Sequence, residues 1–133
     1  MRQQPVEPFD LDWLPIAADV DVRGWTGHGI IIEATRRSYI DKVLPLKVPV
    51  VNISSFMHDP PVPSVLPDNV AIGRAAAQHL IDRGFRSLAF YGVRDWALSD
   101  LRLQGSLEVA TAQGVPVAQH LRSEEHTSEL QSQ

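Results

Sequence analysis

The chain alternates short apolar runs with segments whose apolar residues recur every three or four positions. Runs of the first kind are typical of strands buried on both faces, and the second spacing is typical of helices with one apolar side. The runs predict strands over residues 30–34, 48–54 and 88–92 and the start of a fourth at 115–117. The helical spacing predicts helices over 38–44, 68–84 and 99–114. This order predicts an α/β fold with one parallel sheet flanked by helices.

The clearest helix signal is the stretch that begins at Asp68 and ends at Gly84. Asp68 is a good N-cap, because its carboxylate can accept the free amide hydrogens of the first turn. Gly84 can adopt the left-handed conformation that ends a helix. The residues between them form one apolar face, made by Val70, Gly73, Ala77, Leu80 and Ile81. The small residues Gly73, Ala76 and Ala77 predict that this face lies close against a sheet.

Three segments of the chain differ in character. Residues 1–29 hold no period and contain scattered prolines, which predicts an irregular lead-in. Residues 30–121 carry the predicted strands and helices. Residues 122–133, RSEEHTSELQSQ, resemble the translation of a standard sequencing adapter and have no apolar face, so we interpret them as an artefactual, disordered tail on a fragment. Four strands leave the faces of a parallel sheet uncovered, so we expect exposed apolar surface.

Composition narrows the classes of function. The formal net charge is −4 without a clustered basic face, so these residues are not expected to bind DNA themselves. There is no cysteine, the histidines lack ligand spacing, and no phosphate-binding or catalytic motif is visible, so we expect no metal, no cofactor and no enzyme. The chain lacks a signal peptide and a run long enough to cross a bilayer, which predicts a cytoplasmic protein without membrane contact.

Candidate binding residues follow the predicted strands, where ligands of open α/β sheets bind. Asp68 opens one helix, Trp96 follows the third strand, and Ser99 and Arg102 lie at the start of the next helix. Carboxylate and guanidinium groups form charge-assisted hydrogen bonds with sugar hydroxyls, and an aromatic ring can cover the C–H face of a sugar. The alternatives are that Asp68 is only an N-cap, that Arg102 is solvated and that Trp96 is a packing residue.

Three quoted stretches carry a resemblance to a known family. VPVVNIS at 48–54, VLPDNVAIGRAAAQHLIDRGFRSLAFYGV at 65–93 and SDLRLQG at 99–105 resemble the sensor domain shared by the lactose/galactose-repressor family and periplasmic sugar-binding proteins. The similarity covers roughly residues 25–118. HLIDRGFRSLAFYGV after VLPDN is most similar to xylose operon regulators, in which such a sensor precedes a carboxy-terminal AraC-type helix-turn-helix domain. Ser106 departs from the pattern, which usually has an aromatic residue there, and we expect a thinner helix–sheet contact.

The resemblance implies both a fold and a function. The fold is a partial periplasmic-binding-protein-like type I subdomain, with Asp68 and Arg102 facing the effector. The function is the sensing of a sugar, xylose or a related pentose, by a DNA-binding transcription regulator truncated before its helix-turn-helix. DNA would be bound only through a domain missing from this chain, and the full-length protein would be a homodimer. The alternative is a fragment of a transport-type periplasmic sugar-binding protein.

Overall fold

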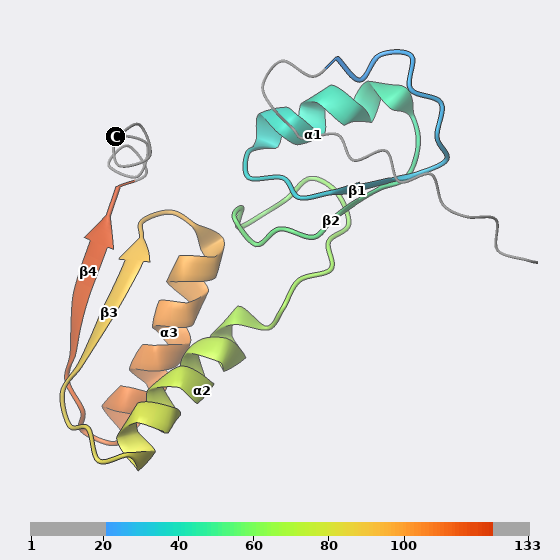
Figure 1. The fold of residues 1–133 in the computed structure, drawn as a ribbon. Helices are drawn as coiled ribbons and strands as arrows, with labels where there is room; N and C mark the ends of the chain where they lie inside the picture. The colour runs from blue at the N-terminus through green and yellow to red at the C-terminus, as the bar shows by residue number, and fades with distance from the viewer. Residues whose placement is uncertain (1–20, 124–133) are drawn as a thin grey trace, which may run out of the picture.

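The computed structural model describes residues 21–123, in which parallel strands alternate with helices (Figure 1). The strands are β1 (Ile30–Ile32), β2 (Val50–Asn52), β3 (Leu88–Val93) and β4 (Val117–Arg122). The helices are α1 (Arg37–Val43), extended by the 3-10 turn η1 (Leu44–Leu46), α2 (Asn69–Asp82) and α3 (Ala97–Ala112). The predicted α/β class with parallel strands flanked by helices is confirmed. The lead-in up to residue 20 and the tail from residue 124 lie outside the described residues.

The four strands form two sheets, so the expected single sheet is wrong. β1 pairs with β2, with Ile30 opposite Val50, and β3 pairs with β4, with Leu88 opposite Val117. Between β2 and α2 the chain is extended and rich in proline. In this stretch Ser64 forms an isolated parallel β-bridge with Asn52, at the end of β2. Proline cannot continue a ladder or a helix, so the chain leaves the first sheet and begins a second structural unit.

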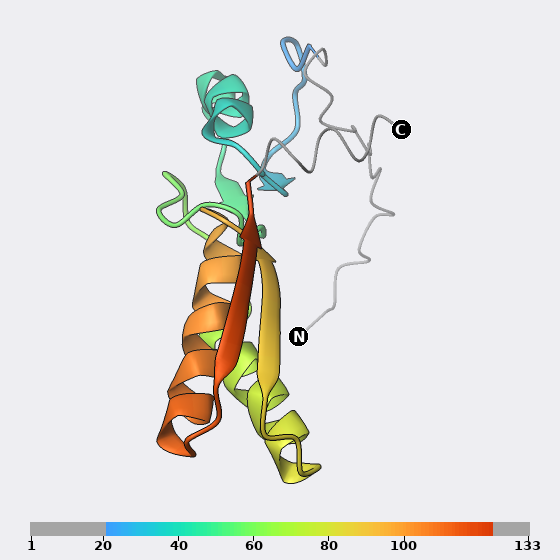
Figure 2. The same cartoon turned by 90° about the vertical axis from the view of Figure 1, so that its left-hand side faces the viewer.

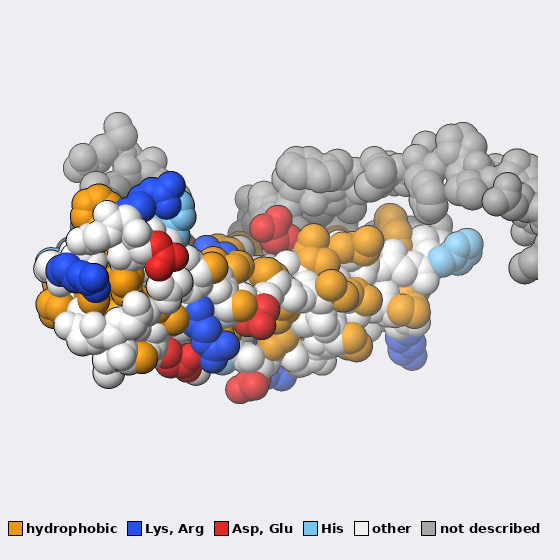
Figure 3. All heavy atoms as spheres, turned by 90° about the horizontal axis from the view of Figure 1, so that it is seen from below, with side chains coloured by type: hydrophobic (Ala, Val, Ile, Leu, Met, Phe, Trp, Pro, Cys, Tyr) orange, Lys and Arg blue, Asp and Glu red, His pale blue; other side chains and the backbone are white. Residues whose placement is uncertain are grey.

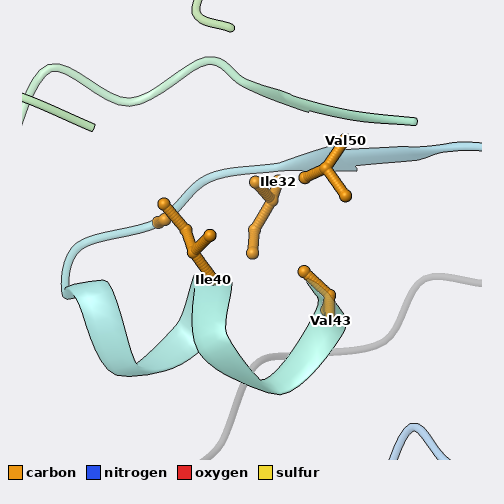
Figure 4. Close-up of a cluster of buried hydrophobic side chains, with 5 residues drawn as sticks. Ile32, Ile40, Val43 and Val50 are labelled. Carbon is orange, nitrogen blue, oxygen red and sulfur yellow. The ribbon is translucent and has the colours of Figure 1, made fainter. Parts of the chain in front are cut away.

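The first unit buries one face of its sheet against α1. Ile40 and Val43 of α1 point toward Ile32 of β1 and Val50 of β2 and form a small core with them (Figure 4). The opposite face of this sheet is open, and Ile31 on it is 77% exposed. Helix α1 begins at Arg37, one residue before the expected start at residue 38, and its N-cap, Arg36, makes no side-chain capping hydrogen bond.

Both predicted ends of α2 are confirmed. The Asp68 Oδ1 atom accepts a hydrogen bond from the Ala71 amide at 2.9 Å, which satisfies one of the free donors of the first turn. At the other end, Gly84 has a φ of 90°, a conformation that strains any residue with a Cβ. Leu80 of the predicted apolar face is 39% exposed, whereas Gly73, Ala77 and Ile81 are buried.

The small residues of α2 lie against a helix, which corrects the expected contact with a sheet. A Cβ added at Gly73 would collide with the carbonyl oxygen of Arg102, and one added at Gly105 would collide with the carbonyl oxygen of Val70. The two glycines therefore let α2 and α3 cross with their backbones in contact. Ser106 lies in this helix–helix contact, with its hydroxyl 3.2 Å from the carbonyl oxygen of Gly73, so its small size affects the helix crossing instead of a helix–sheet contact.

An ion pair joins the two helices on their solvent side. The Arg74 Nη2 atom lies 2.6 Å from Glu108 Oε2, and the Nε atom donates to the same oxygen at 2.7 Å. The hydrogen bond from Arg74, assisted by one from Gln104, lowers the pKa of the Glu108 carboxyl below its usual value. Because both side chains are exposed, this ion pair contributes little to the stability of the helix pair.

Within residues 21–123, the helices of the second unit cover one face of its sheet. Figures 1 and 2 show α2 and α3 on the same side of β3 and β4, where Ile81, Ala110 and Val115 form the buried cluster. On the other face, Tyr91 of β3 is 71% exposed. Its ring stacks on the His120 ring, and the guanidinium of Arg122 lies over it, 5.8 Å from the ring centre. Hydrophobic side chains also remain at the surface on the underside of the molecule (Figure 3). The expected uncovered apolar surface is thus confirmed.

The last strand extends further than expected. Arg122, which the sequence placed in the tail, is the last residue of β4.

Candidate functional site

The loop after β2 meets the first turn of α3. The Leu98 amide donates to the carbonyl oxygen of Ser55 at 2.8 Å, and the Ala97 amide donates to that of Phe56 at 3.0 Å. These bonds satisfy helix donors that a capping side chain would otherwise accept. This explains why α3 begins at Ala97, two residues before the expected start at Ser99, and why its N-cap is Trp96, which offers no capping oxygen.

Two side-chain contacts reinforce this junction, here called the seam and defined as residues 55–58 and 96–100. The rings of Phe56 and Trp96 meet edge to face with their centres 4.5 Å apart. The His58 Nε2 atom lies 2.7 Å from Asp100 Oδ2. The seam is therefore the place where the first unit, with β1 and β2, contacts the second.

Asn52 organises the first unit beside the seam. Its side chain is fully buried, and its Oδ1 atom accepts from the amides of Ala34 and Ser54 at 3.3 and 3.0 Å. Its Nδ2 atom donates to the Ser54 carbonyl oxygen at 2.8 Å and to the Ser64 hydroxyl at 3.2 Å. Every polar atom of this buried amide is satisfied, so Asn52 is a structural residue that fixes the loop after β2.

The structure brings Asp68 and Arg102 to the same end of the helix pair. The Arg102 Nε atom donates to Asn69 Oδ1 at 3.0 Å, so its side chain reaches the first residue of α2, immediately after Asp68. The Asp68 carboxylate is exposed and uses Oδ1 as the cap. Within residues 21–123, Asp68 Oδ2 and the terminal nitrogens of Arg102 have no hydrogen-bond partner. One acceptor oxygen of Asp68 and the terminal donors of Arg102 therefore remain available near the start of α2.

The other two candidate residues lie earlier in α3. The Ser99 side chain is only 6% exposed, and its Oγ accepts the Val93 amide at 2.9 Å, which ties the end of β3 to α3. Trp96 packs on Phe56 in the seam. Ser99 is one helical turn before Arg102, so the two share a side of α3, whereas the contacts of Trp96 are with the first unit.

Sequence reasoning assigned no role to three residues that take part in this arrangement. Phe56 and His58 belong to the seam, and Asn69 holds the Arg102 side chain. A signal was available for Asn69, since it follows the capping Asp68 directly. For Phe56 and His58 the only signal in the sequence is their position soon after the second strand. Their partners are about forty residues away in sequence, so the contacts cannot be predicted from neighbouring residues.

A wide-open surface patch lies along one side of α3 and includes Leu103, Leu107 and Thr111. It shares only Asp100 with the seam, and it does not include Asp68 or Arg102. Among residues 21–123 no three His, Asp or Glu side chains gather closely enough to hold a metal ion. No helix in the described part of the chain is long and apolar enough to cross a membrane.

Comparison with known proteins places this arrangement in a family. The profile described as periplasmic binding proteins and sugar binding domain of LacI family matches residues 17–131. The xylose operon regulatory protein of Escherichia coli K12 is 29% identical over 76 residues, which cover 54% of this chain and 19% of that protein. The chain thus spans about a fifth of the length of this relative.

Two solved structures are similar in fold to most of this chain. A putative ribose operon repressor from Burkholderia thailandensis is 28% identical, with a TM-score of 0.58 over 77% of this chain and 41% of its own. A periplasmic binding protein/LacI transcriptional regulator from Alkaliphilus metalliredigens, complexed with D-xylulofuranose, shares the fold at 24% identity, with a TM-score of 0.56 over 71% of this chain and 35% of its own. With most of its length matched by the family profile, this chain belongs to the family of periplasmic binding proteins and LacI-type sugar-binding domains.

Proposed function

We propose that this chain is part of the sugar-sensing domain of a transcription regulator and that its effector is xylose or a related pentose. The observation that carries the proposal is the convergence of Asp68 and Arg102 at the start of α2. The similarity to a xylose operon regulatory protein supports the choice of pentose.

The chemistry of the two side chains fits a polyhydroxylated ligand. A carboxylate oxygen accepts hydrogen bonds from sugar hydroxyls, and a guanidinium donates to hydroxyl or ring oxygens. The pair can therefore bind one hydroxyl as a donor and a neighbouring one as an acceptor. In this proposal Asp68 is both N-cap and ligand contact, because its Oδ1 is used by the helix while its Oδ2 is open to the sugar. Trp96 covers the C–H face of the ring. Ser99, proposed from the sequence as a contact, is buried and bonded to the Val93 amide, so in this proposal it supports the start of α3 without reaching the sugar.

The two units provide the conformational change that a sensor requires. In this proposal the sugar binds beside the starts of α2 and α3, and it shifts the population toward the relative orientation of the two units that binds it more tightly. A change in the relative orientation of the units would alter the contacts of the seam, since its backbone and side-chain contacts join the loop after β2 to α3. An attached DNA-binding domain then reports the shift.

The complete protein in this proposal is a cytoplasmic homodimer that binds DNA through an AraC-type helix-turn-helix domain absent from this chain. The family also includes periplasmic binding proteins, so a transport role is the competing function. DNA binding separates the two: the complete regulator should bind its operator in a manner that changes with added sugar, whereas a transport protein should not retain DNA.

Calorimetric titration of the complete protein tests the proposed ligand class. D-xylose or a second pentose such as D-ribose should give a saturable heat with a stoichiometry of one sugar per chain. A hexose of the same concentration range serves as the specificity control. If no pentose gives saturable binding, the proposed effector is wrong.

The two roles of Asp68 can be separated by replacing it with asparagine. Asparagine caps helices about as well as aspartate, so stability should change little, but the charged hydrogen bond to the sugar is lost. We expect the sugar affinity to fall by roughly 1.5–3 kcal/mol, or about 10- to 150-fold, in a calorimetric titration. Asp82→Asn makes the same charge change at the far end of α2 and should leave the affinity unchanged. Equal affinities for Asp68→Asn and the unsubstituted protein would remove Asp68 from the site.

A further inference from the structure

Asn69 is a buried polar residue at the start of α2 whose side chain faces Arg102. Its side chain is 3% exposed, and its Oδ1 accepts the Arg102 Nε–H at 3.0 Å. Arg102 is half-buried and comes from the other helix, 33 positions later in the chain. The bond therefore links α2 to α3 at the point where the proposed ligand binds.

The backbone that carries Arg102 is already held in place. The carbonyl oxygen of Arg102 lies against Gly73, where a Cβ would collide with it. The Ser106 hydroxyl is 2.9 Å from that same oxygen and 3.2 Å from the carbonyl oxygen of Gly73. Because this part of α3 cannot move away from α2 without breaking the crossing, the remaining freedom of Arg102 is in its side chain.

The bond to Asn69 restricts that remaining freedom. A guanidinium is planar and rigid, so an acceptor at Nε restricts both its position and the plane in which Nη1 and Nη2 lie. Within residues 21–123 those two nitrogens have no hydrogen-bond partner, so they remain available to donate to a ligand. A long side chain that is ordered before binding loses less entropy when the ligand arrives.

We propose that Asn69 is the positioning residue for Arg102: it orients the guanidinium so that its terminal nitrogens receive the sugar. This inference rests on the proposed function, because it assumes that Arg102 contacts the ligand. It adds a residue that does not touch the sugar and yet sets the affinity. The competing role is structural, in which Asn69 only fills and satisfies the start of α2.

Two substitutions distinguish positioning from a structural role. Asn69→Ala removes the acceptor, whereas Asn69→Asp keeps an acceptor oxygen at the same reach and adds a charge that a helix N-terminus favours. With D-xylose as the probe and D-ribose as the second pentose, we expect Asn69→Ala to weaken binding by the complete protein about tenfold. Asn69→Asp should restore the affinity to within about threefold of the unsubstituted protein. Gln78→Ala, on the same helix and away from Arg102, is the control and should have no effect.

A double-mutant cycle ties the effect to Arg102. In an Arg102→Ala background, Asn69→Ala should cause no further loss of affinity, because nothing remains to be positioned. If Arg102→Ala itself leaves the affinity unchanged, the proposed site is wrong. If Arg102→Ala weakens binding and Asn69→Ala adds its effect independently, only the positioning role is overturned. Should Asn69→Ala fail to fold, Asn69→Ser, whose shorter side chain cannot reach the Arg102 Nε, takes its place in the cycle.

A measurement without sugar gives an independent readout. In arginine-labelled protein, the Arg102 Nε–H signal, assigned by its loss in Arg102→Ala, should be protected from solvent exchange in the unsubstituted protein and in Asn69→Asp. It should become unprotected in Asn69→Ala, or in Asn69→Ser, while the thermal midpoint stays within a few degrees. Protection that survives the loss of the acceptor would overturn the inference whatever the sugar affinities are.

Discussion

Replacing Gly105 with alanine should destabilise the protein, although alanine is the better helix former. Helix propensity alone predicts a gain of about 1 kcal/mol for this change. At Gly105, however, a Cβ would collide with the carbonyl oxygen of Val70 and lie 2.9 Å from the amide nitrogen of Arg74. Both are backbone atoms of α2, so the collision can be relieved only by moving the helix. Overpacking costs about 1–3 kcal/mol, and we expect the upper end for a collision with backbone. After the propensity gain of about 1 kcal/mol is subtracted, the net loss in urea denaturation of the complete protein should be roughly 2 kcal/mol.

The sign of the change makes this test decisive. Gln104→Ala, at the neighbouring exposed position of α3, should be close to neutral because it removes only an exposed hydrogen bond to Glu108. Gly73→Ala should be destabilising for the same reason as Gly105→Ala, and the double substitution should cost less than the sum, since one separation of the helices relieves both collisions. An increase in stability for Gly105→Ala would show that the helices are not in backbone contact.

Arg102→Ala should produce the second large effect, on binding instead of folding. If the guanidinium donates to the sugar as proposed, its removal deletes a charged hydrogen bond worth roughly 1.5–3 kcal/mol, which is about a 10- to 150-fold loss of affinity. Stability should change less, because the Arg102 side chain makes one hydrogen bond among the described residues, to Asn69. Calorimetric titration and thermal unfolding of the same samples measure the two effects separately.

The control for Arg102→Ala is Arg74→Ala. Arg74 has the same charge and also bonds across the two helices, to Glu108, but on their solvent side. Its replacement should therefore leave the sugar affinity unchanged. A similar loss of affinity in both variants would point to a general effect of charge or of helix packing, and it would contradict a direct contact between Arg102 and the sugar.

Local features of the fold could be predicted because their causes are local. The cap at Asp68 and the left-handed Gly84 depend on residues within one helical turn, and both are confirmed. The start of α3 could not be predicted in this way. Its first donors bond to carbonyl oxygens of Ser55 and Phe56, about forty positions earlier in the chain, so no capping side chain is needed beside Trp96.

The candidate site was predictable in its residue types and not in its connections. The spacing placed Asp68 and Arg102 at the starts of two helices, but it could not show that Arg102 bonds to Asn69 or that Ser99 is engaged by the Val93 amide. Hydrogen bonds between side chains far apart in sequence depend on how two helices cross. That crossing is set by Gly73 and Gly105, whose small size suits packing against a helix as well as against a sheet.

By itself, the sequence determined which segments are strands and helices, where α2 begins and ends, and that the chain alternates as an α/β protein does, because each of these follows from periodicity and from residues close in the chain. Only the tertiary structure decided that the strands divide into two sheets, that α2 packs on α3, and that the loop after β2 reaches α3. The reason is that hydrophobic periodicity reports which side of an element is buried, whereas the partner that buries it is chosen by contacts between distant segments.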